Sequence, residues 1–199
     1  SNPPPELQLA WQSLLREILA AGSSDEELVE CLSVPVSFVR SAEAESVLER
    51  AGLGYTYPEM KKVFFTEEPN QFGHSYRRFW KGPLGRDDLS DIKELLSGQP
   101  STKRAVLTLV DTAGKKVPCV NVLQFLIRDE RLETVYFARA QDAYRKFCAD
   151  ALCICDLAHQ VAESLSLEIG PILGTIGSAH IYLEDLPKAR EVAEADYFR

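Results

Sequence analysis

Residues 117–165 read VPCVNVLQFLIRDERLETVYFARAQDAYRKFCADALCICDLAHQVAESL and contain the pattern that decides the fold. Apolar residues dominate segments 117–127 and 134–139, which predicts two buried strands. The following segment, 143–165, carries apolar side chains at helical spacing and predicts a long helix. Strands accompanied by one dominant helix indicate the α+β class.

Weaker patterns on both sides extend this arrangement. Segment 29–39 is ambiguous, because Pro35 favours either an interrupted strand or a short helix followed by a strand. Helical spacing and capping residues predict three further helices, at residues 6–21, 42–51 and 87–96. Apolar runs predict strands at residues 60–65, 105–110, 167–172 and 180–183.

The length and composition are those of one globular domain, with 199 residues, 45% apolar and 26% charged. No apolar stretch is long enough to span a membrane, and the first residues lack the features of a signal peptide. We therefore expect a cytoplasmic protein without a membrane partner. The net charge of −8 argues against a nucleic acid polymer as partner, because phosphate contacts need clustered Lys and Arg. A nucleotide monomer remains compatible, since a few well-placed cations can bind it.

The five cysteines are odd in number and form no CxxC pair, which argues against a zinc ribbon or a disulfide framework. We expect no metal site. Cys119 is the candidate nucleophile, because it follows Pro118 and a loop with Lys115 and Lys116, and nearby cations favour a thiolate. The alternative is that Cys119 packs as a small hydrophobe, as free cysteines generally do. Further cations that the fold could bring to it are Lys103, Arg104 and Arg139.

Six short motifs follow one another in a fixed order. They read Phe72-Gly73-His74-Ser75-Tyr76-Arg77, Pro100-Ser101-Thr102-Lys103-Arg104, Pro118-Cys119, Gln124-Phe125, Phe137-Ala138-Arg139-Ala140-Gln141-Asp142 and Gly177-Ser178-Ala179-His180-Ile181-Tyr182. In this order they resemble thymidylate synthases and the related pyrimidine nucleotide hydroxymethylases. The resemblance implies a mixed β-sheet packed by a long central helix and shorter helices, in one domain over residues 1–199. Within it, residues 1–52 would form a helical N-terminal part and residues 73–182 the nucleotide-binding and catalytic core.

The resemblance also implies a covalent mechanism. The thiolate of Cys119 would add to carbon 6 of the pyrimidine, and carbon 5 would then attack the one-carbon unit of 5,10-methylenetetrahydrofolate. Tyr76 is the second catalytic candidate, because Phe72 stands where the family has a tyrosine associated with proton removal from carbon 5. Arg139 would contact the phosphate and lower the pKa of the thiol. Other implied substrate-binding residues are Gln124, His180 and Tyr182, with Lys103 and Arg104 reaching the phosphate from the partner chain of a homodimer. The implied folate-binding residues are Asp142 and Trp80.

Asp150 is the position that distinguishes the bases. Uracil-specific members of the family carry asparagine there, and cytidylate hydroxymethylases carry aspartate. A carboxyl group suits cytosine because it accepts from the amino group and, when protonated, donates to N3. The resemblance therefore implies hydroxymethylation of carbon 5 in CMP or dCMP, in which water captures the methylene intermediate. The alternative is that Asp150 is a surface residue on the long helix.

Besides Phe72, four further residues depart from the family pattern: Val120, Ala140, Lys146 and Ser178. Lys146 stands where a glycine normally lets folate approach, and only 17 residues follow Tyr182, so we expect a reduced folate site. Three alternatives stay open: a thymidylate synthase acting on dUMP, an enzyme that uses no folate, and a non-catalytic nucleotide-binding protein. The sequence does not distinguish a ribonucleotide from a deoxyribonucleotide.

Overall fold

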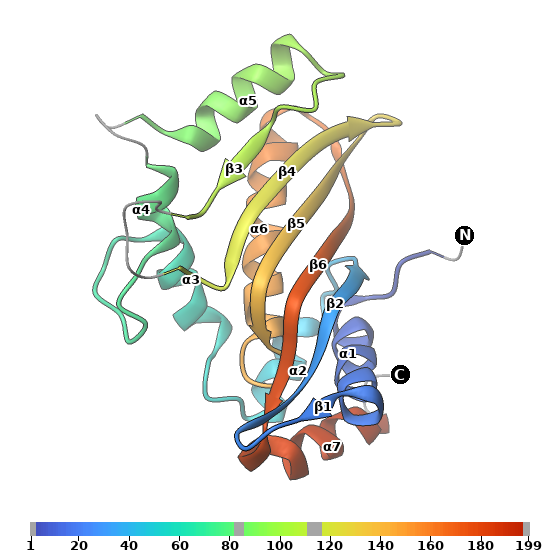
Figure 1. Ribbon diagram of the computed structural model, residues 1–199. Helices are drawn as coiled ribbons and strands as arrows, with labels where there is room; N and C mark the ends of the chain where they lie inside the picture. Colours follow the sequence, from blue (N-terminus) through green and yellow to red (C-terminus); the bar gives the residue numbers. More distant parts are fainter. Residues whose placement is uncertain (1–2, 82–85, 111–116, 197–199) are drawn as a thin grey trace.

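The computed structural model describes residues 3–81, 86–110 and 117–196 (Figure 1). Within these ranges a mixed β-sheet is covered on one face by helices, which confirms the α+β class and the sheet that the resemblance implied. The elements are α1 (Leu7–Ala21), β1 (Ser23–Ser24), β2 (Leu28–Phe38), α2 (Ala44–Ala51), α3 (Tyr57–Phe65), α4 (Tyr76–Trp80), α5 (Asp88–Gly98), β3 (Val106–Thr108), β4 (Val120–Arg128), β5 (Arg131–Asp142), α6 (Phe147–Ser164), β6 (Glu168–Tyr182), a 3₁₀ turn (Leu183–Asp185) and α7 (Leu186–Glu194).

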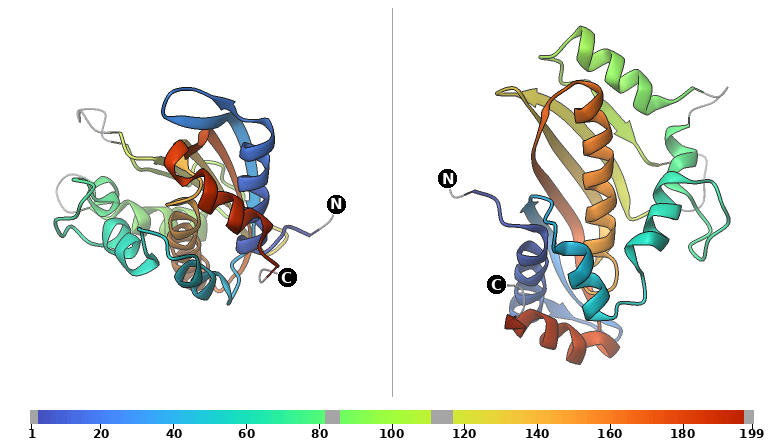
Figure 2. Two further views of the ribbon diagram at one scale, coloured as in Figure 1. Left: turned by 90° about the horizontal axis from the view of Figure 1, so that it is seen from below. Right: turned by 180° about the vertical axis from the view of Figure 1, so that it is seen from behind.

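The sheet has the strand order β1-β2-β6-β5-β4-β3. Strands β5 and β6 run parallel, and every other pair of described neighbours is antiparallel. Two parallel strands that follow each other in the chain need a crossover connection, and α6 provides it. Figure 2 shows α6 lying along the sheet in the view from behind.

Helix α6 is the centre of the core. In its first half, residues 147–155, side chains around the whole circumference are buried, and in its second half Val161 is buried while His159 and Gln160 are exposed. A helix that is apolar all round must be covered on all sides, and here the sheet lies on one side and α1, α2, α3 and α5 on the others. Helix α7 packs against α1 at the end of the sheet where β6 finishes (Figure 1).

The other face of the sheet carries no helix in the described part of the chain (Figure 1). The residues Val106, Gln124, Val135 and Leu173 follow one another across four neighbouring strands, as the register shows. Val106 and Leu173 are exposed, and so is Phe137, which lies two residues beyond Val135 on the same side of β5. This surface, which we call the open face, therefore presents apolar side chains to solvent.

Several elements differ from the sequence-based predictions. Residues 60–65 were expected to form a strand, which is wrong, because they belong to α3. Thr56 and Glu59 form a capping box there, and Pro58 lies in the first turn, so the N-terminal backbone groups are satisfied locally. The two strands expected at 167–172 and 180–183 are one continuous strand, β6.

The ambiguous segment 29–39 is a strand, β2, and Pro35 lies inside it opposite Thr175 of β6. Beyond Val29 and Glu30, which pair with the two-residue β1, the outer side of β2 has no neighbouring strand among the residues that the structure describes. A proline is tolerated at such an edge because no N–H group is needed there. The N-terminal part expected to be helical thus also contributes two strands. None of the described helices is long and apolar enough to cross a membrane.

Gly174 in β6 provides a stability test, because a Cβ atom there would overlap the ring of Tyr136, which is buried on the neighbouring strand. Gly174→Ala is expected to lower the free energy of unfolding by about 1–3 kcal/mol through overpacking, measured by urea denaturation. Gly98→Ala is the matched control, since a Cβ there meets no atom within 4 Å, and in α5 it should stabilise by about 0.5–1 kcal/mol. Equal effects of the two substitutions would contradict this packing.

Candidate active site

Cys119 lies immediately before β4, where the register of the sheet shifts between Val120 and Val122. The residue inside this bulge, Asn121, is buried and donates from Nδ2 to the Pro118 carbonyl oxygen at 2.9 Å. A bulge changes the direction of the neighbouring side chains. The hydrogen bond of Asn121 in this bulge stabilises the turn that carries the Cys119 thiol.

Arg139 of β5 holds this turn from the neighbouring strand. Its N–H donates both to the carbonyl oxygen of Cys119, at 2.9 Å, and to Oδ1 of Asn121, at 2.7 Å. Its exposed guanidinium donates from Nε and Nη2 to the carbonyl oxygen of Val117, at 3.0 and 2.8 Å, and from Nε to that of Pro118, at 3.1 Å. In this conformation the Arg139 side chain stabilises the backbone before Cys119 through these hydrogen bonds.

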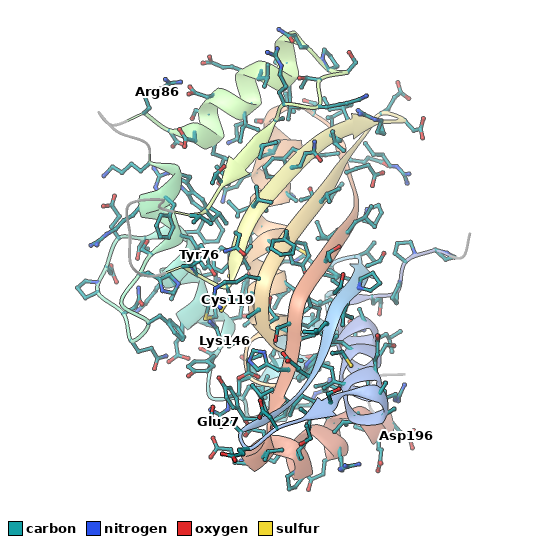
Figure 3. The ribbon with its side chains drawn as sticks, viewed as in Figure 1. Glu27, Tyr76, Arg86, Cys119, Lys146 and Asp196 are labelled. Atoms are coloured by element: carbon teal, nitrogen blue, oxygen red, sulfur yellow. The ribbon has the colours of Figure 1, made fainter. Side chains whose placement is uncertain are left out.

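Tyr76, at the first turn of α4, is buried beside this thiol (Figure 3). Its hydroxyl oxygen accepts the backbone N–H of Val120 at 3.1 Å. Burial raises the pKa of Tyr76 well above its usual value, and the nearby acidic groups of Asp150 and Cys119 raise it further. The phenol is therefore protonated at neutral pH and suits a hydrogen-bonding role better than that of a base.

Asp150 of α6 is buried, which is incompatible with the surface-residue alternative. Its Oδ2 accepts from Nε2 of Gln141 at 2.6 Å, and its Oδ1 has no hydrogen-bond partner among the described residues. Burial raises the pKa of Asp150, although Lys146 and the hydrogen bond from Gln141 oppose the shift. A buried carboxyl with one unsatisfied oxygen is costly unless a ligand completes it.

Lys146 is the closest described cation to the candidate nucleophile. Its Nζ lies 3.9 Å from Sγ of Cys119 and 4.4 Å from the centre of the Phe72 ring. Burial lowers the pKa of Lys146, but Asp150, Cys119 and Tyr55 outweigh this and leave the pKa raised. The amine is therefore an ammonium group inside the site (Figure 3).

The pKa of the Cys119 thiol is raised, mainly because the sulfur is buried. Lys146 and Arg139 lower it, and Asp150 and Asp142 raise it. Arg139 thus acts on the pKa of the thiol in the expected direction, but burial outweighs it and the net pKa is raised. Lys115 and Lys116, which were also considered as cations near the thiol, lie outside the described residues.

His180 and Tyr182 lie where β6 finishes, at the same end of the sheet as Cys119. The centres of their rings lie 5.4 Å apart in an edge-to-face arrangement. His180 is opposite Asp142 in the register of β5 and β6. The buried Asp142 accepts the backbone N–H groups of Tyr144 and Arg145 at its Oδ1, at 3.2 and 2.8 Å. This turn delays the start of α6, which was expected at residue 143, until Phe147.

Three predicted substrate-binding residues lie elsewhere in this chain. Gln124 belongs to the open face and follows Cys119 by five residues, or roughly 16 Å of strand at 3.3 Å per residue. Its Nε2 donates to the Lys103 carbonyl oxygen at 2.8 Å, and Arg104 donates to Oε1 of Gln99 at 2.9 Å. The structure therefore does not bring Gln124, Lys103 or Arg104 to the thiol of the same chain.

Trp80, predicted to bind folate, is buried at the end of α4. It lines a separate pocket of about 190 Å³ together with Phe65, Arg77 and Gln160. Cys119 is not among the residues that line this pocket, so the structure does not join Trp80 to the candidate nucleophile.

Sequence reasoning missed two residues of the site and noted a third only as a departure. Asn121 and Gln141 were not selected, although a polar residue inside an apolar strand, as Asn121 is, signals a bulge or a buried hydrogen bond. Lys146 was noted only as an obstacle to folate. Its position four residues before Asp150 was the available signal, because residues at this spacing share one side of a helix.

Comparisons with known proteins agree with this arrangement. The family model described as thymidylate synthase matches residues 9–197. A curated relative from Methanothermobacter thermautotrophicus is 31% identical over 143 residues, which cover 70% of this chain and 64% of the relative. A thymidylate synthase from Listeria monocytogenes is 26% identical over 133 residues, 64% of this chain and 42% of that protein. The chain thus spans less than two thirds of the length of these relatives.

Among solved structures, the thermostable thymidylate synthase A from Bacillus subtilis superimposes with a TM-score of 0.72 and 17% sequence identity. The superposition covers 96% of this chain and 85% of that chain. At this identity the likeness concerns the fold, and it includes nearly all of the chain described above.

Asp150→Asn provides a pH-dependent stability test. Because the folded-state pKa of Asp150 is raised, stability is lost as the pH rises from below the unfolded-state value through the folded-state value. Asparagine does not ionise, so Asp150→Asn should raise Tm at pH 7 by about 2–4 °C, the shift that about 1 kcal/mol produces in a chain of this size.

At about pH 3 the gain should vanish, because Asp150 is then protonated in both states. Calorimetric scans at both pH values measure the effect. Asp129→Asn, in an exposed turn, is the matched control and should show no such dependence. An equal gain from Asp150→Asn at both pH values would contradict a buried, pKa-shifted carboxyl.

Proposed function

Because the chain belongs to the thymidylate synthase family, we propose that it is an enzyme that transfers a one-carbon unit to carbon 5 of a pyrimidine nucleoside monophosphate. The finer proposal is hydroxymethylation of CMP or dCMP. The observation that carries it is the buried carboxyl of Asp150, whose Oδ1 lacks a partner among the described residues.

Cys119 is the nucleophile in this proposal. Its sulfur bonds to carbon 6 of the base, and the electron pair of the 5,6 double bond becomes available at carbon 5. When carbon 5 has gained the one-carbon unit and lost its proton, the bond between that unit and the folate nitrogen breaks with its electron pair on nitrogen, which leaves an exocyclic methylene. Water then adds to this methylene and gives up a proton, and the 5,6 double bond re-forms as the sulfur leaves carbon 6 as a thiolate. Tyr76, a buried phenol near the sulfur, would orient the base or a water molecule by hydrogen bonding.

Asp150 selects the base. A protonated carboxyl donates to N3 of cytosine and accepts from its amino group, whereas the uracil edge needs the opposite pattern. The raised pKa of Asp150 favours the required proton. Gln141 donates to Oδ2, so the proton of the carboxyl would lie on Oδ1 and donate to N3, and the second lone pair of Oδ2 would accept from the amino group.

Folate, the one-carbon donor of the proposal, has some suitable partners in the site. Asp142 is a buried carboxyl at the Cys119 end of the sheet and would accept pterin N–H groups, and the Tyr55 and Phe72 rings, 5.1 Å apart, offer an apolar surface. Methylenetetrahydrofolate would supply the electrophilic carbon. Because Lys146 occupies space beside the thiol, a reaction without folate is the second candidate.

A homodimer formed through the open face is part of the proposal. Phe137 and Leu173 are exposed on this face, and such apolar patches indicate association surfaces. Lys103 and Arg104 would then act at the phosphate of the partner's nucleotide, since neither reaches Cys119 of its own chain. We also propose that residues 1–199 act as one domain, because α1 packs against both β2 and α6.

Trapping with 5-fluorinated CMP, dCMP, UMP and dUMP tests the nucleophile, because fluorine at carbon 5 prevents completion of the reaction. With methylenetetrahydrofolate, wild type should gain the mass of the nucleotide and the one-carbon donor in denaturing mass spectrometry. Cys119→Ala should form no adduct, and Cys31→Ser should behave as wild type. Adduct formation without folate would favour the folate-free candidate, and no adduct with any nucleotide would reject catalysis.

Base preference tests Asp150. Wild type should hydroxymethylate CMP or dCMP, and Asp150→Asn should shift the ratio of kcat/KM for cytosine over uracil substrates by at least about tenfold toward uracil, the effect of one unsatisfied buried hydrogen bond. Asp129→Asn should leave the ratio unchanged. A wild type that prefers uracil, with a ratio insensitive to Asp150→Asn, would replace the cytosine proposal by the thymidylate synthase alternative.

A further inference from the structure

Lys146 is placed at the thiol by the start of α6. It is the residue before the first turn of this helix, and its carbonyl oxygen accepts the backbone N–H of Asp150 at 3.0 Å. Both side chains therefore leave the same side of the helix and enter the same buried space. The ammonium group lies 3.9 Å from Sγ of Cys119 and 4.4 Å from the centre of the Phe72 ring.

We propose that Lys146 is a positioning residue whose ammonium group pairs with the thiolate of Cys119 when the thiol ionises, and so favours the reactive form of the nucleophile. The proposal rests on the function proposed above, in which Cys119 attacks the pyrimidine. It assigns a role to a side chain that otherwise stands out as an obstacle to folate.

The other charged and titratable groups around the sulfur do not provide this pairing. Asp150 of α6 and Asp142 of β5 disfavour a thiolate because they carry negative charge when ionised, and Tyr76 of α4 is a neutral phenol. Arg139 favours a thiolate, but its Nε and Nη2 donate to backbone carbonyl oxygens. Lys146 is thus the cation whose charged atom points at the sulfur.

The electrostatics agree with the geometry. Among the groups that lower the pKa of Cys119, Lys146 has the largest effect. Without it, Arg139 would remain, in the described part of the chain, to oppose the effect of burial and of the two carboxyl groups. The Phe72 ring, 4.4 Å from Nζ, also supports the ammonium group, since cations are attracted to aromatic faces.

The test measures the reactivity of Cys119 without any nucleotide. Wild type and variants are alkylated with iodoacetamide between pH 6 and pH 10, and modification of the Cys119 peptide is followed by mass spectrometry, which separates it from Cys31. Lys146→Met keeps the length of the side chain and removes its charge. It should slow alkylation of Cys119 at pH 7 by about tenfold and move the pH profile to higher pH.

Lys146→Arg keeps the charge and should retain most of the wild-type rate and profile. Lys62→Met, on the exposed side of α3, is the matched control and should behave as wild type. An unchanged Cys119 profile in Lys146→Met would overturn the proposal. If Lys146→Met does not fold, the proposal is decided by Lys146→Gln, whose profile must show the same shift to support it.

The result of this alkylation test can be distinguished from the result of the nucleotide-trapping test of the proposed function. Failure to trap any nucleotide, together with a Lys146-dependent alkylation profile, would reject the catalytic proposal and keep the ion pair. Normal trapping with a profile that does not depend on Lys146 would reject only the pair.

Discussion

The parallel pairing of β5 and β6 is the constraint on which the molecule depends. Because both strands run in the same direction, the chain must return across the sheet between them, and α6 makes this return inside the core. The turn from β5 into α6 is held by Asp142, and it places Lys146 and Asp150 over the bulge that carries Cys119. The site is thus a consequence of the crossover.

Burial is the second determinant of the chemistry. It raises the pKa of Cys119, Tyr76 and Asp150 together, so that a thiol, a phenol and a carboxylic acid that resist ionisation meet around one ammonium group. Such convergence of perturbed groups is typical of functional sites. It also favours a carboxyl that can donate a hydrogen bond, which is the feature that distinguishes cytosine from uracil in the proposed reaction.

Much of this could be read from the sequence, and the exceptions have physical causes. The strands and helix within residues 117–165 were predicted because their apolar patterns are long and periodic. Residues 60–65 were mistaken for a strand because a short apolar run fits either structure, although Thr56 and Glu59 carried the capping signal. The motifs located Cys119 and Asp150, but the reach of Lys146 depends on the turn before α6, and the separation of Gln124 and Trp80 from the thiol depends on strand register and helix packing.

The two outermost strands of the sheet have a consequence for assembly. At one margin β1 has two residues and β2 carries Pro35, and at the other β3 has three residues. Short border strands and a proline are features that hinder the pairing of a sheet edge with another chain. Growth of the sheet by strand-to-strand pairing is therefore discouraged at both edges. The homodimer proposed above, in which two copies meet through the open face, is compatible with such edges.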